Sequence, residues 1–480
     1  MPISDAASTS IGEIACMLFT STVFLYYFLP AFLVAYFCAP FRWKSLVLTL
    51  ASYVFYGWWR PDFVLLMWVS TLVDFNCGRG IERDRDRGGT GRRWVLLSCC
   101  VNLGLLAYFK YANFGIDTLN AILAASDLAP VAWAEIVLPV GISFYTFQTL
   151  SYTIDVYRRD AETVHRFLDF ACYVAMFPQL VAGPIVRYRS IAEQLHARKH
   201  SWRLVSIGLL VFQAGLAKKV LLADTFAIAA DRGFGAETVT ALEAWVAALA
   251  YTFQIYFDFS GYSDMAIGLG LVLGFRFPIN FDRPYISLSI TEFWRRWHIS
   301  LSSFLRDYLY IPLGGNRYGP WRTYVNLALT MLLGGLWHGA AWTFIVWGAY
   351  QGFWLIVERL SGKRSLYAGL PRVLQNLVTF VLVIVGWVFF RAESVPQALT
   401  FLTAMFGGGA AESSTLFVEW SRVQTLAFIA APLIVWGTMT TQAHARHPKV
   451  WWIVSVSILF LFSLVHLHRA ANVPFLYFQF

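Results

Sequence analysis

Two histidines stand alone among apolar residues and are the strongest candidates for chemistry in the sequence. His338 lies in the run Gly334-Gly-Leu-Trp-His-Gly-Ala-Ala-Trp342, whose small residues allow two flanking helices to pack closely. No carboxylate lies within ten residues of His338, and no second histidine follows at i+3 or i+4, so the spacing does not favour a metal site. A buried neutral imidazole can accept a hydroxyl proton. A structural histidine bonded to the backbone is the alternative.

The second histidine, His298, lies in a segment with helical periodicity. The capping box Ser289-x-x-Glu292 predicts that a helix begins there and continues over 289–310. One apolar stripe and one polar side are typical of an amphipathic helix at the cytoplasmic membrane interface. The stripe contains Trp294, Trp297, Leu301, Phe304, Leu305 and Tyr308, and the polar side contains Arg295, Arg296, Ser303, Arg306 and Asp307. His298 falls at the border of the stripe, where it serves either as an interfacial anchor or as a catalyst.

The same segment is rich in arginine and ends in a glycine-rich turn. Ile311-Pro-Leu-Gly-Gly-Asn-Arg317 either only stops the helix or presents backbone N–H groups to a phosphate. Four arginines make an anionic donor plausible and are the candidates for binding its phosphates, and they equally satisfy the rule that cytoplasmic loops are basic. These are Arg295, Arg296, Arg306 and Arg317.

Two carboxylates lie inside another apolar stretch, Tyr256-Phe-Asp-Phe-Ser-Gly-Tyr-Ser-Asp264. Charged groups within a membrane are costly, so each needs a partner or a function. Either Asp258 and Asp264 belong to a hydrogen-bonded cluster that holds a broken helix, or one of them lines a substrate path.

Composition shows which elements must position these residues. Of the 480 residues, 58% are hydrophobic and 14% are charged, whereas a soluble domain carries roughly a quarter charged residues. A soluble enzyme is therefore excluded, and 20 Trp, 23 Tyr and 41 Phe exclude a disordered chain. The net charge of +9 comes from basic residues between apolar stretches, so no nucleic-acid partner is expected. The six cysteines lack metal-ligand spacing, and no metal is expected.

Apolar stretches predict an all-α, multi-pass membrane protein with roughly twelve spans. The stretches are 18–38, 46–59, 61–76, 94–111, 136–156, 204–222, 244–275, 323–338, 341–358, 374–390, 425–440 and 450–468. Basic loops alternate with acidic ones such as 112–135, 223–243 and 392–424, which places both termini outside the cytoplasm. With both termini outside, the number of spans must be even. This requires that 244–275 is one interrupted span and that 168–185 enters and leaves on the cytoplasmic side. Such interruptions imply a polar cavity inside the bundle.

The motifs resemble those of the membrane-bound O-acyltransferase (MBOAT) family. The matching runs are Leu18-Phe-Thr-Ser-Thr-Val-Phe-Leu25, 141–157, Phe177-Pro-Gln-Leu-Val-Ala-Gly-Pro-Ile185, Asp258-Phe-Ser-Gly-Tyr-Ser-Asp264, Phe293-Trp-Arg-Arg-Trp-His298, the His338 segment and the terminal Tyr477-Phe-Gln-Phe480. They occur in the order of the family and cover 17–480, which we expect to form one membrane domain. Residues 1–16 are then an extracytoplasmic extension. The resemblance implies a helical bundle around a through-membrane tunnel.

The resemblance also implies roles for the polar residues. His338 matches the principal catalytic residue of the family and His298 its usual second one. Loop charge places His298 on the cytoplasmic side and His338 near the outward end of a span, at opposite ends of one buried path. Residues expected to line the tunnel or support the site are Asp258, Tyr262, Asp264, Trp294, Arg295, Trp297, Asp307, Asn316, Trp337 and Trp342.

By resemblance, the expected function is O-acetyl transfer across the inner membrane of a bacterium. The donor would be cytoplasmic acetyl-coenzyme A, a substrate and not a bound cofactor, and the acceptor an extracytoplasmic polysaccharide, alginate first. Expected partners are a periplasmic serine-dependent acetyltransferase related to SGNH hydrolases, the polysaccharide synthesis and export machinery, and membrane lipid. The final acceptor is then either the serine of that partner or the sugar.

Other functions remain open at this stage. Within the family, the acceptor could be peptidoglycan, cellulose or another exopolysaccharide, or the cargo could be D-alanine for teichoic acid. A secondary transporter or flippase would also need a broken helix and a polar cavity, although no second copy of the Asp258 region is visible. A structural scaffold for a secretion complex would explain the bundle but not two histidines in polar interruptions.

Overall fold

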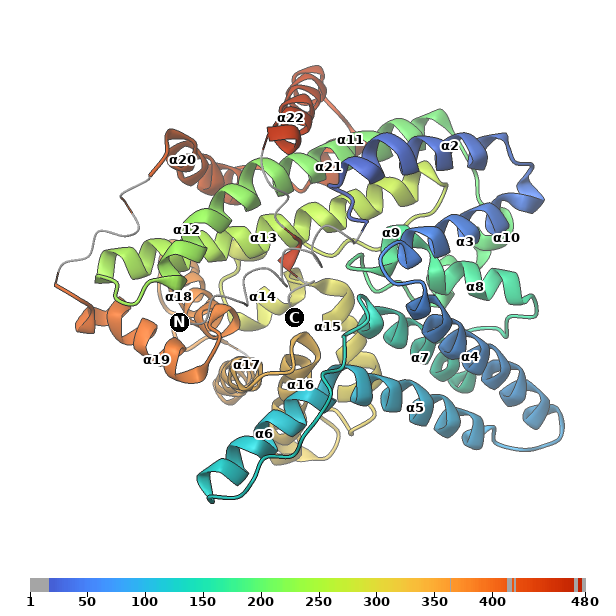
Figure 1. The fold of residues 1–480 in the computed structure, drawn as a ribbon, viewed down its shortest axis with the longest axis horizontal. Coiled ribbons are helices and arrows are strands. Elements are labelled where there is room, and N and C mark those ends of the chain that lie inside the picture. Colours follow the sequence, from blue (N-terminus) through green and yellow to red (C-terminus); the bar gives the residue numbers. More distant parts are fainter. Residues whose placement is uncertain (1–16, 363, 412–416, 418–419, 470–473, 477–480) are drawn as a thin grey trace. The chain divides into compact units, whose positions relative to one another are not determined.

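The computed structural model describes residues 17–362, 364–411, 417, 420–469 and 474–476. Across these residues all regular elements are helical and none is a strand, which confirms the predicted all-α class (Figure 1). The predicted extension 1–16 lies outside the described residues. The chain divides into two compact units, Met1–Val205 with Leu269–Phe277 and Ser206–Gly268 with Pro278–Phe480.

The first unit is an assembly of apolar helices, most of which are joined by short turns, whereas residues 126–141 form a long connection without a helix. Its elements are η1 (Val23–Phe28), α2 (Leu29–Cys38), α3 (Phe41–Gly57), α4 (Asp62–Asp86), α5 (Arg92–Leu106), η2 (Ala107–Tyr111), α6 (Ala112–Ala125), α7 (Ile142–Arg158), α8 (Phe167–Ala175), α9 (Phe177–Leu180) and α10 (Tyr188–Ala197). Asp74 of α4 connects three of these helices, because it accepts hydrogen bonds from Ser98 and Asn102 of α5 and from Thr153 of α7. Buried polar groups in an apolar bundle need such partners.

The segment 168–185 is interrupted as predicted. Helix α8 ends at Ala175, and the short helix α9 starts after Met176, with proline in its first turn. The side chains of this region are buried, and the Gln179 amide donates a hydrogen bond to the Tyr173 carbonyl. That 168–185 enters and leaves on one side of the membrane stays a prediction.

The second unit contains most of α11 and α13 and the rest of the chain. Its elements are α11 (Trp202–Ala217), η3 (Lys218–Ala223), α12 (Asp224–Gly235), α13 (Ala241–Val272), η4 (Pro284–Ile286), α14 (Ile290–Arg296), α15 (Ile299–Leu305), η5 (Arg306–Tyr310), α16 (Gly319–His338), α17 (Trp342–Leu360), α18 (Arg372–Arg391), α19 (Val395–Thr403), η6 (Ala404–Gly408), α20 (Arg422–Gly437), α21 (Thr441–Arg446) and α22 (Val450–Arg469).

The predicted interruption of 244–275 is wrong, because α13 is one continuous helix from Ala241 to Val272. Gly261 does not end this helix but allows close contact with α11. A Cβ at Gly261 would lie 2.7 Å from the Gly215 carbonyl oxygen, and one at Gly268 would lie 2.6 Å from that of Gly208. The two glycine pairs are seven residues apart on each helix, so α11 and α13 approach closely along two turns.

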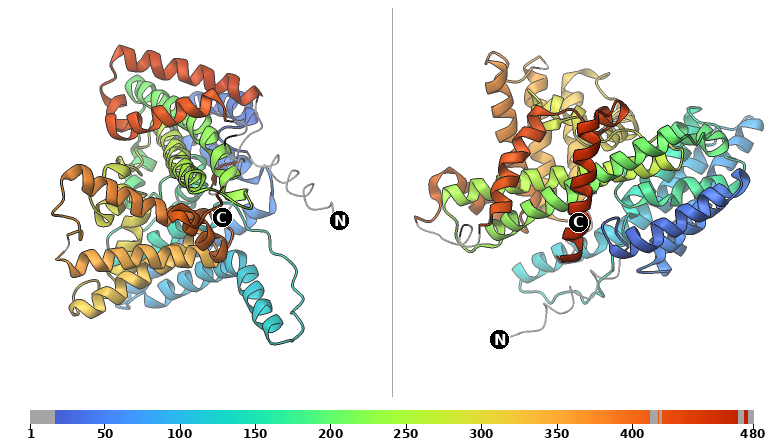
Figure 2. Two further views of the ribbon diagram at one scale, coloured as in Figure 1. Left: turned by 90° about the vertical axis from the view of Figure 1, so that its left-hand side faces the viewer. Right: turned by 90° about the horizontal axis from the view of Figure 1, so that it is seen from above.

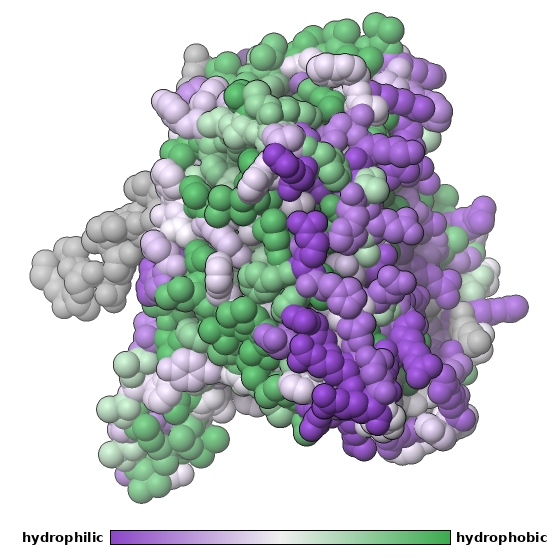
Figure 3. All heavy atoms as spheres, turned by 90° about the vertical axis from the view of Figure 1, so that its right-hand side faces the viewer, coloured by the Kyte–Doolittle hydropathy of each residue, from purple (hydrophilic) through white to green (hydrophobic). Residues whose placement is uncertain are grey.

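Long apolar helices agree with a membrane protein. Among the described residues, four helices are long and apolar enough to cross a membrane, and their bounds are Arg92–Ala125, Trp202–Gly235, Arg372–Arg391 and Val450–His468. Figure 3 shows a face on which a broad hydrophobic area adjoins a band of hydrophilic residues. The count of roughly twelve spans stays a prediction.

The predicted start of two loops is wrong, because in the structure each loop begins later in the sequence. The helix that contains α5 continues to Ala125, and the helix that contains α11 continues to Gly235, so the expected loops 112–135 and 223–243 are partly helical. Both continuations pass through a π-helical turn that contains lysine, Lys110 in the first and Lys218 and Lys219 in the second. Lys219 pairs with Asp224 one turn later, at 2.6 Å, which lets a charged turn continue the helix.

Helices α16 and α17 form a tight hairpin that positions His338 at its turn. They lie side by side in Figure 1, and Figure 2 shows the same pair from two further sides, coloured gold. A Cβ at Gly348 would lie 2.5 Å from the Met331 carbonyl oxygen, and one at Gly335 would overlap the Phe344 carbonyl oxygen. Only residues without a Cβ fit at this crossing.

Replacing Gly348 with valine is therefore expected to destabilise the protein by about 1–3 kcal/mol, because overpacking forces the two helices apart. Thermal unfolding and size-exclusion profiles in detergent measure the effect. The matched control is Gly104→Val, since a Cβ at this helical glycine would have no neighbouring atom within 4 Å. Equal unfolding midpoints for the two variants would contradict this role of the crossing.

Candidate functional site

The start of the arginine-rich segment agrees with its sequence. The Ser289 hydroxyl accepts a hydrogen bond from the Glu292 backbone N–H at 3.0 Å, and the Glu292 carboxylate accepts one from the Leu288 N–H at 2.9 Å. A helix therefore begins where the capping pattern predicts it. It ends after Arg296, however, so the single amphipathic helix predicted over 289–310 is wrong.

The helix breaks at Trp297 and His298. Trp297 is extended, and His298 has φ 44° and ψ 55°, in a region that few residues other than glycine adopt. Asn280 stabilises the break: its carbonyl accepts from the Ile299 N–H at 2.9 Å, and its Oδ1 accepts from the Ser300 N–H at 3.2 Å. The amide side chain thus replaces hydrogen bonds that a continuous helix would supply, and α15 begins in a new direction.

The break places His298 in the interior. Its side chain is 0% exposed, so the interpretation of His298 as an interfacial anchor is wrong. Its Nδ1 lies 3.1 Å from Asn280 Oδ1, which already accepts from a backbone N–H, so Nδ1 carries the hydrogen and Nε2 the lone pair. The connection between α14 and α15 lies outside the candidate membrane spans. Burial lowers the pKa of His298 to about 3, so the imidazole is neutral at physiological pH.

His338 lies beside His298. It is the last residue of α16 and 3% exposed, and its ring centroid is 6.3 Å from that of His298. The rings of Trp337, Trp347 and Phe390 contact it at 5.0, 5.1 and 5.2 Å. The prediction that the two histidines lie at opposite ends of a path is wrong, because the break at His298 turns its ring inward. The two imidazoles can act on the same group.

Aromatic residues enclose the histidine pair. Trp297 is 1% exposed and lies 4.9 Å from Trp387, which stacks on Trp347 at 5.9 Å. Trp294 donates from its indole N–H to the Gln351 amide oxygen at 3.1 Å. The apolar rings keep water away and strengthen electrostatic interactions inside. Trp347 was missed, although it follows Thr343 and precedes Gln351 at the four-residue spacing of one helix face.

Several predicted residues occupy other places. Trp342 is 54% exposed at the start of α17 and Asn316 is exposed, so the structure does not bring them to the histidines. Asp307 pairs with Arg306 at 2.6 Å. Tyr262 is buried and stacks on Phe475, at 4.6 Å. The through-membrane tunnel stays a prediction.

The two aspartates of α13 are engaged by lysines. Asp258 lies 2.8 Å from the Lys219 Nζ and accepts the Leu476 backbone N–H at 2.9 Å. Asp264 lies 2.7 Å from the Lys218 Nζ. These contacts favour the hydrogen-bonded cluster over a carboxylate that lines a substrate path. The double lysine inside the apolar stretch 204–222 was the available signal for these partners.

Two adjoining cavities lie between α14–α15 and the α16–α17 hairpin. Their volumes are about 590 and about 550 Å³, and both are lined by Thr291, Arg295, Leu327, Leu355 and Arg359. The smaller one also reaches Trp294 and Ile299, the neighbours of the histidine break, and its lining is mainly apolar. Arginines and apolar side chains thus line the region that the two cavities share.

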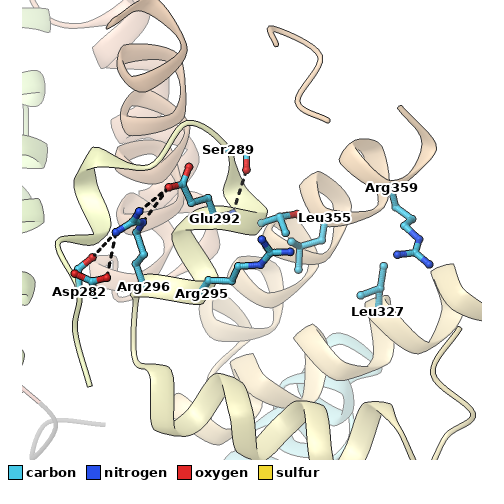
Figure 4. Close-up of a pocket in the computed structure, with 9 residues that line it drawn as sticks. Asp282, Ser289, Glu292, Arg295, Arg296, Leu327, Leu355 and Arg359 are labelled. Atoms are coloured by element: carbon cyan, nitrogen blue, oxygen red, sulfur yellow. Dashed lines mark hydrogen bonds and ion pairs between the residues drawn. The ribbon is translucent and has the colours of Figure 1, made fainter. Parts of the chain in front are cut away.

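Figure 4 shows how the arginines of the larger cavity differ. Arg296 is held by Asp282 at 3.2 Å and by Glu292 at 2.9 Å. No carboxylate of the described residues lies within ion-pair distance of Arg295 or Arg359, so both can bind an anion. Of the four predicted phosphate ligands, Arg306 also lines the smaller cavity, whereas Arg317 lines neither. Arg359 was missed, because its position beside an apolar stretch indicated loop orientation alone.

Comparison with known proteins shows which family and which relatives this chain resembles. The model of the membrane-bound O-acyltransferase family matches residues 156–393, which contain both histidines and the arginine-lined cavities. The chain is 52% identical to the probable alginate O-acetylase of Pseudomonas aeruginosa, over 83% of this chain and 77% of that protein. It is 47% identical to the probable alginate O-acetylase of Pseudomonas putida, over 97% of this chain and 100% of that protein. It is also 38% identical to the peptidoglycan O-acetyltransferase of Helicobacter pylori, over 84% and 82%.

Proposed function

Because the chain belongs to the membrane-bound O-acyltransferase family, we propose that it moves acetyl groups from cytoplasmic acetyl-coenzyme A across the bacterial inner membrane for the O-acetylation of alginate. It is an acyltransferase and a membrane protein. The observation that carries the proposal is the buried pair of imidazoles, 6.3 Å apart, beside cavities lined by two arginines that form no ion pair with any carboxylate the structure describes. Alginate is the proposed polymer because the relatives named alginate O-acetylases match up to 97% of the chain.

In the proposed reaction His338 is the general base. Its imidazole takes the proton of an acceptor hydroxyl while the hydroxyl oxygen attacks the acetyl carbonyl carbon. The new C–O bond forms, the thioester C–S bond breaks, and the thiolate leaves with the proton from His338. His298 lies next to the reacting atoms with its Nε2 lone pair, set by the bond from Nδ1 to Asn280. The products are an O-acetyl ester and free coenzyme A.

The acceptor hydroxyl belongs either to the polymer or to a serine of a periplasmic SGNH-hydrolase-like partner that passes the acetyl group on. The donor is recognised by charge, since coenzyme A carries several phosphates. Guanidinium groups bind phosphates through paired N–H donors. Arg295 and Arg359 face the shared part of both cavities, and Arg306 lines the smaller one.

Deleting the gene tests the acceptor. Ester-linked acetate is measured separately on alginate, peptidoglycan and cellulose, before and after complementation with the intact gene. We expect acetate to be lost from alginate alone. Loss from peptidoglycan with normal alginate acetylation would contradict the proposed polymer and favour the activity named for the Helicobacter pylori relative.

Replacing Arg295 and Arg359 together with alanine is expected to raise the KM for acetyl-coenzyme A at least tenfold, with a smaller change in kcat. Each lost hydrogen bond to a charged group is worth about 1.5–3 kcal/mol. Steady-state kinetics on the reconstituted protein measure both constants. Arg317→Ala is the matched control, because this exposed arginine lies outside the cavities. The same KM in the double variant and the control would contradict the proposed donor site.

A further inference from the structure

A second cationic cluster lies in the first unit, around Tyr36 of α2. The Arg198 Nε donates to the Tyr36 hydroxyl at 2.8 Å, and the His200 Nε2 lies 3.1 Å from the same oxygen. The Lys44 Nζ of α3 donates to the Tyr36 carbonyl at 2.6 Å and lies 4.4 Å from the Tyr36 ring centroid. Segments more than 150 residues apart in sequence thus bring three basic side chains to one tyrosine.

Two of these basic groups, Arg198 and Lys44, are buried, whereas His200 is partly exposed. Arg198 is 5% exposed and Lys44 is 8% exposed. The remaining partners of Arg198 are neutral: the Ser45 hydroxyl at 3.4 Å, the Leu195 carbonyl at 3.2 Å, and aromatic rings. Throughout the described ranges no carboxylate lies within 4.0 Å of the nitrogens of the three basic side chains. The buried Lys219, by contrast, has two carboxylates within 2.8 Å.

Such an arrangement is costly by itself. A cation withdrawn from water loses several kcal/mol of solvation unless an opposite charge is near. Lys44 and Arg198 also repel each other, since both lie against the same tyrosine. Hydroxyls, carbonyls and aromatic rings reduce this cost but do not neutralise the charge. An external anion would neutralise this charge.

The surroundings indicate which anion reaches the cluster. Exposed basic side chains flank it at Arg42, Lys199 and Arg276, and exposed aromatic rings lie next to it at Phe37 and Trp43. Arginine, lysine and aromatic residues gather in this way at the level of lipid headgroups. The predicted loops that contain Lys44, Arg198 and Arg276 are basic, which predicts that they are cytoplasmic. Figure 1 shows α2, α3 and α10 in one part of the first unit. Anionic lipids concentrate in the cytoplasmic leaflet.

We propose that Lys44, Arg198 and His200 bind the phosphate of an anionic phospholipid, such as phosphatidylglycerol, from the cytoplasmic leaflet. The partly exposed His200 and the Lys44 ammonium contact the phosphate. Arg198, which is more deeply buried, supplies a second positive charge. Phe37 and Trp43 lie against the acyl chains. This site is separate from the histidine pair and does not depend on the acetyl-transfer proposal.

Native mass spectrometry of the purified full-length protein tests the site. Detergent micelles are supplied with phosphatidylglycerol or phosphatidylcholine of equal chain length, and retained lipid is counted. We expect wild type to retain phosphatidylglycerol preferentially. Lys44→Gln with His200→Gln is expected to lower this retention at least fivefold. The variant loses the Lys44 charge, which contributes about 1 kcal/mol near an anionic surface, and the imidazole that contacts the phosphate. Lys44→Arg, which keeps the charge, should retain the lipid.

Two controls separate the alternatives. Arg60→Gln removes a charge from the same unit but from an exposed ion pair with Asp62, so it should leave lipid retention unchanged. Inorganic phosphate at millimolar concentration should not raise the unfolding temperature as phosphatidylglycerol does. Equal retention of the two lipids by wild type, unchanged retention in the folded double variant, or equal stabilisation by inorganic phosphate would each overturn the proposal.

Discussion

Replacing His338 with alanine is expected to lower acetyl transfer to alginate by about 10²–10⁴-fold, the usual contribution of a general base. Polymer-bound acetate in a complemented deletion strain measures the loss, and membrane levels of the variant are matched to wild type. His466→Ala is the control, because it removes an exposed histidine in α22. Unchanged acetylation by His338→Ala at normal expression would refute the assignment.

The double variant of His338 and His298 extends this test. The two rings are 6.3 Å apart and act on one transfer in the proposed reaction. Groups that work as a unit show strongly non-additive losses. We therefore expect the double alanine variant to be about as inactive as His338→Ala alone. Losses that multiply would show that the two histidines act in separate steps.

Replacing Lys219 with methionine is expected to destabilise the protein by about 3–5 kcal/mol, because the buried Asp258 and the partly buried Asp224 lose their shared cation. Lys219 lies 2.6 Å from Asp224 and 2.8 Å from Asp258, and it is 3% exposed. The free energy of unfolding in detergent measures the effect. Adding Asp258→Asn should restore part of the stability, since it removes one of the stranded charges.

The matched control for this charge cluster is Lys449→Met, an exposed lysine before α22. It should unfold at the midpoint of wild type. If Lys219→Met were as stable as this control, the buried ion pairs would not hold α13 to the π-helical turn. Acetyl transfer by a folded Lys219 variant is measured as well, because α13 also carries Phe259, whose ring contacts His298 at 4.6 Å.

The continuous α13 weakens the case for a transporter. That alternative depended on a helix broken inside the membrane at Asp258, where unwound backbone would bind a substrate or an ion. The helix is unbroken, and the carboxylate is instead bound by Lys219 and the Leu476 N–H. The polar residues of α13 thus have a structural explanation that needs no transported substrate.

Local sequence patterns predicted the parts of the fold that depend on local physics. Hydropathy alone indicates apolar helices, and glycines on both sides of His338 indicate a helix end, because small residues favour close packing and chain reversal. Ser289 and Glu292, three residues apart, likewise mark the start of a helix. Each of these features involves neighbours in the chain, so no tertiary information was required.

The features that were missed depend on distant residues. The break at His298 is stabilised by Asn280, 18 residues upstream, and helical periodicity across 289–310 contains no trace of that contact. The predicted interruption of 244–275 is wrong for the same reason, because Gly261 packs against Gly215 on another helix and does not end its own. Arg359 joins Arg295 at the cavities only because α17 folds back beside α14. Sequence position gave no reason to group them.

The most direct test of the account is a structure of the full-length protein in lipid nanodiscs with coenzyme A bound. We predict that the phosphates of coenzyme A contact Arg295 and Arg359 and that its sulfur lies within reach of His338, beside His298. Coenzyme A bound elsewhere, or with its sulfur remote from both histidines, would contradict the claim that the arginine-lined cavities deliver the acetyl group to this pair.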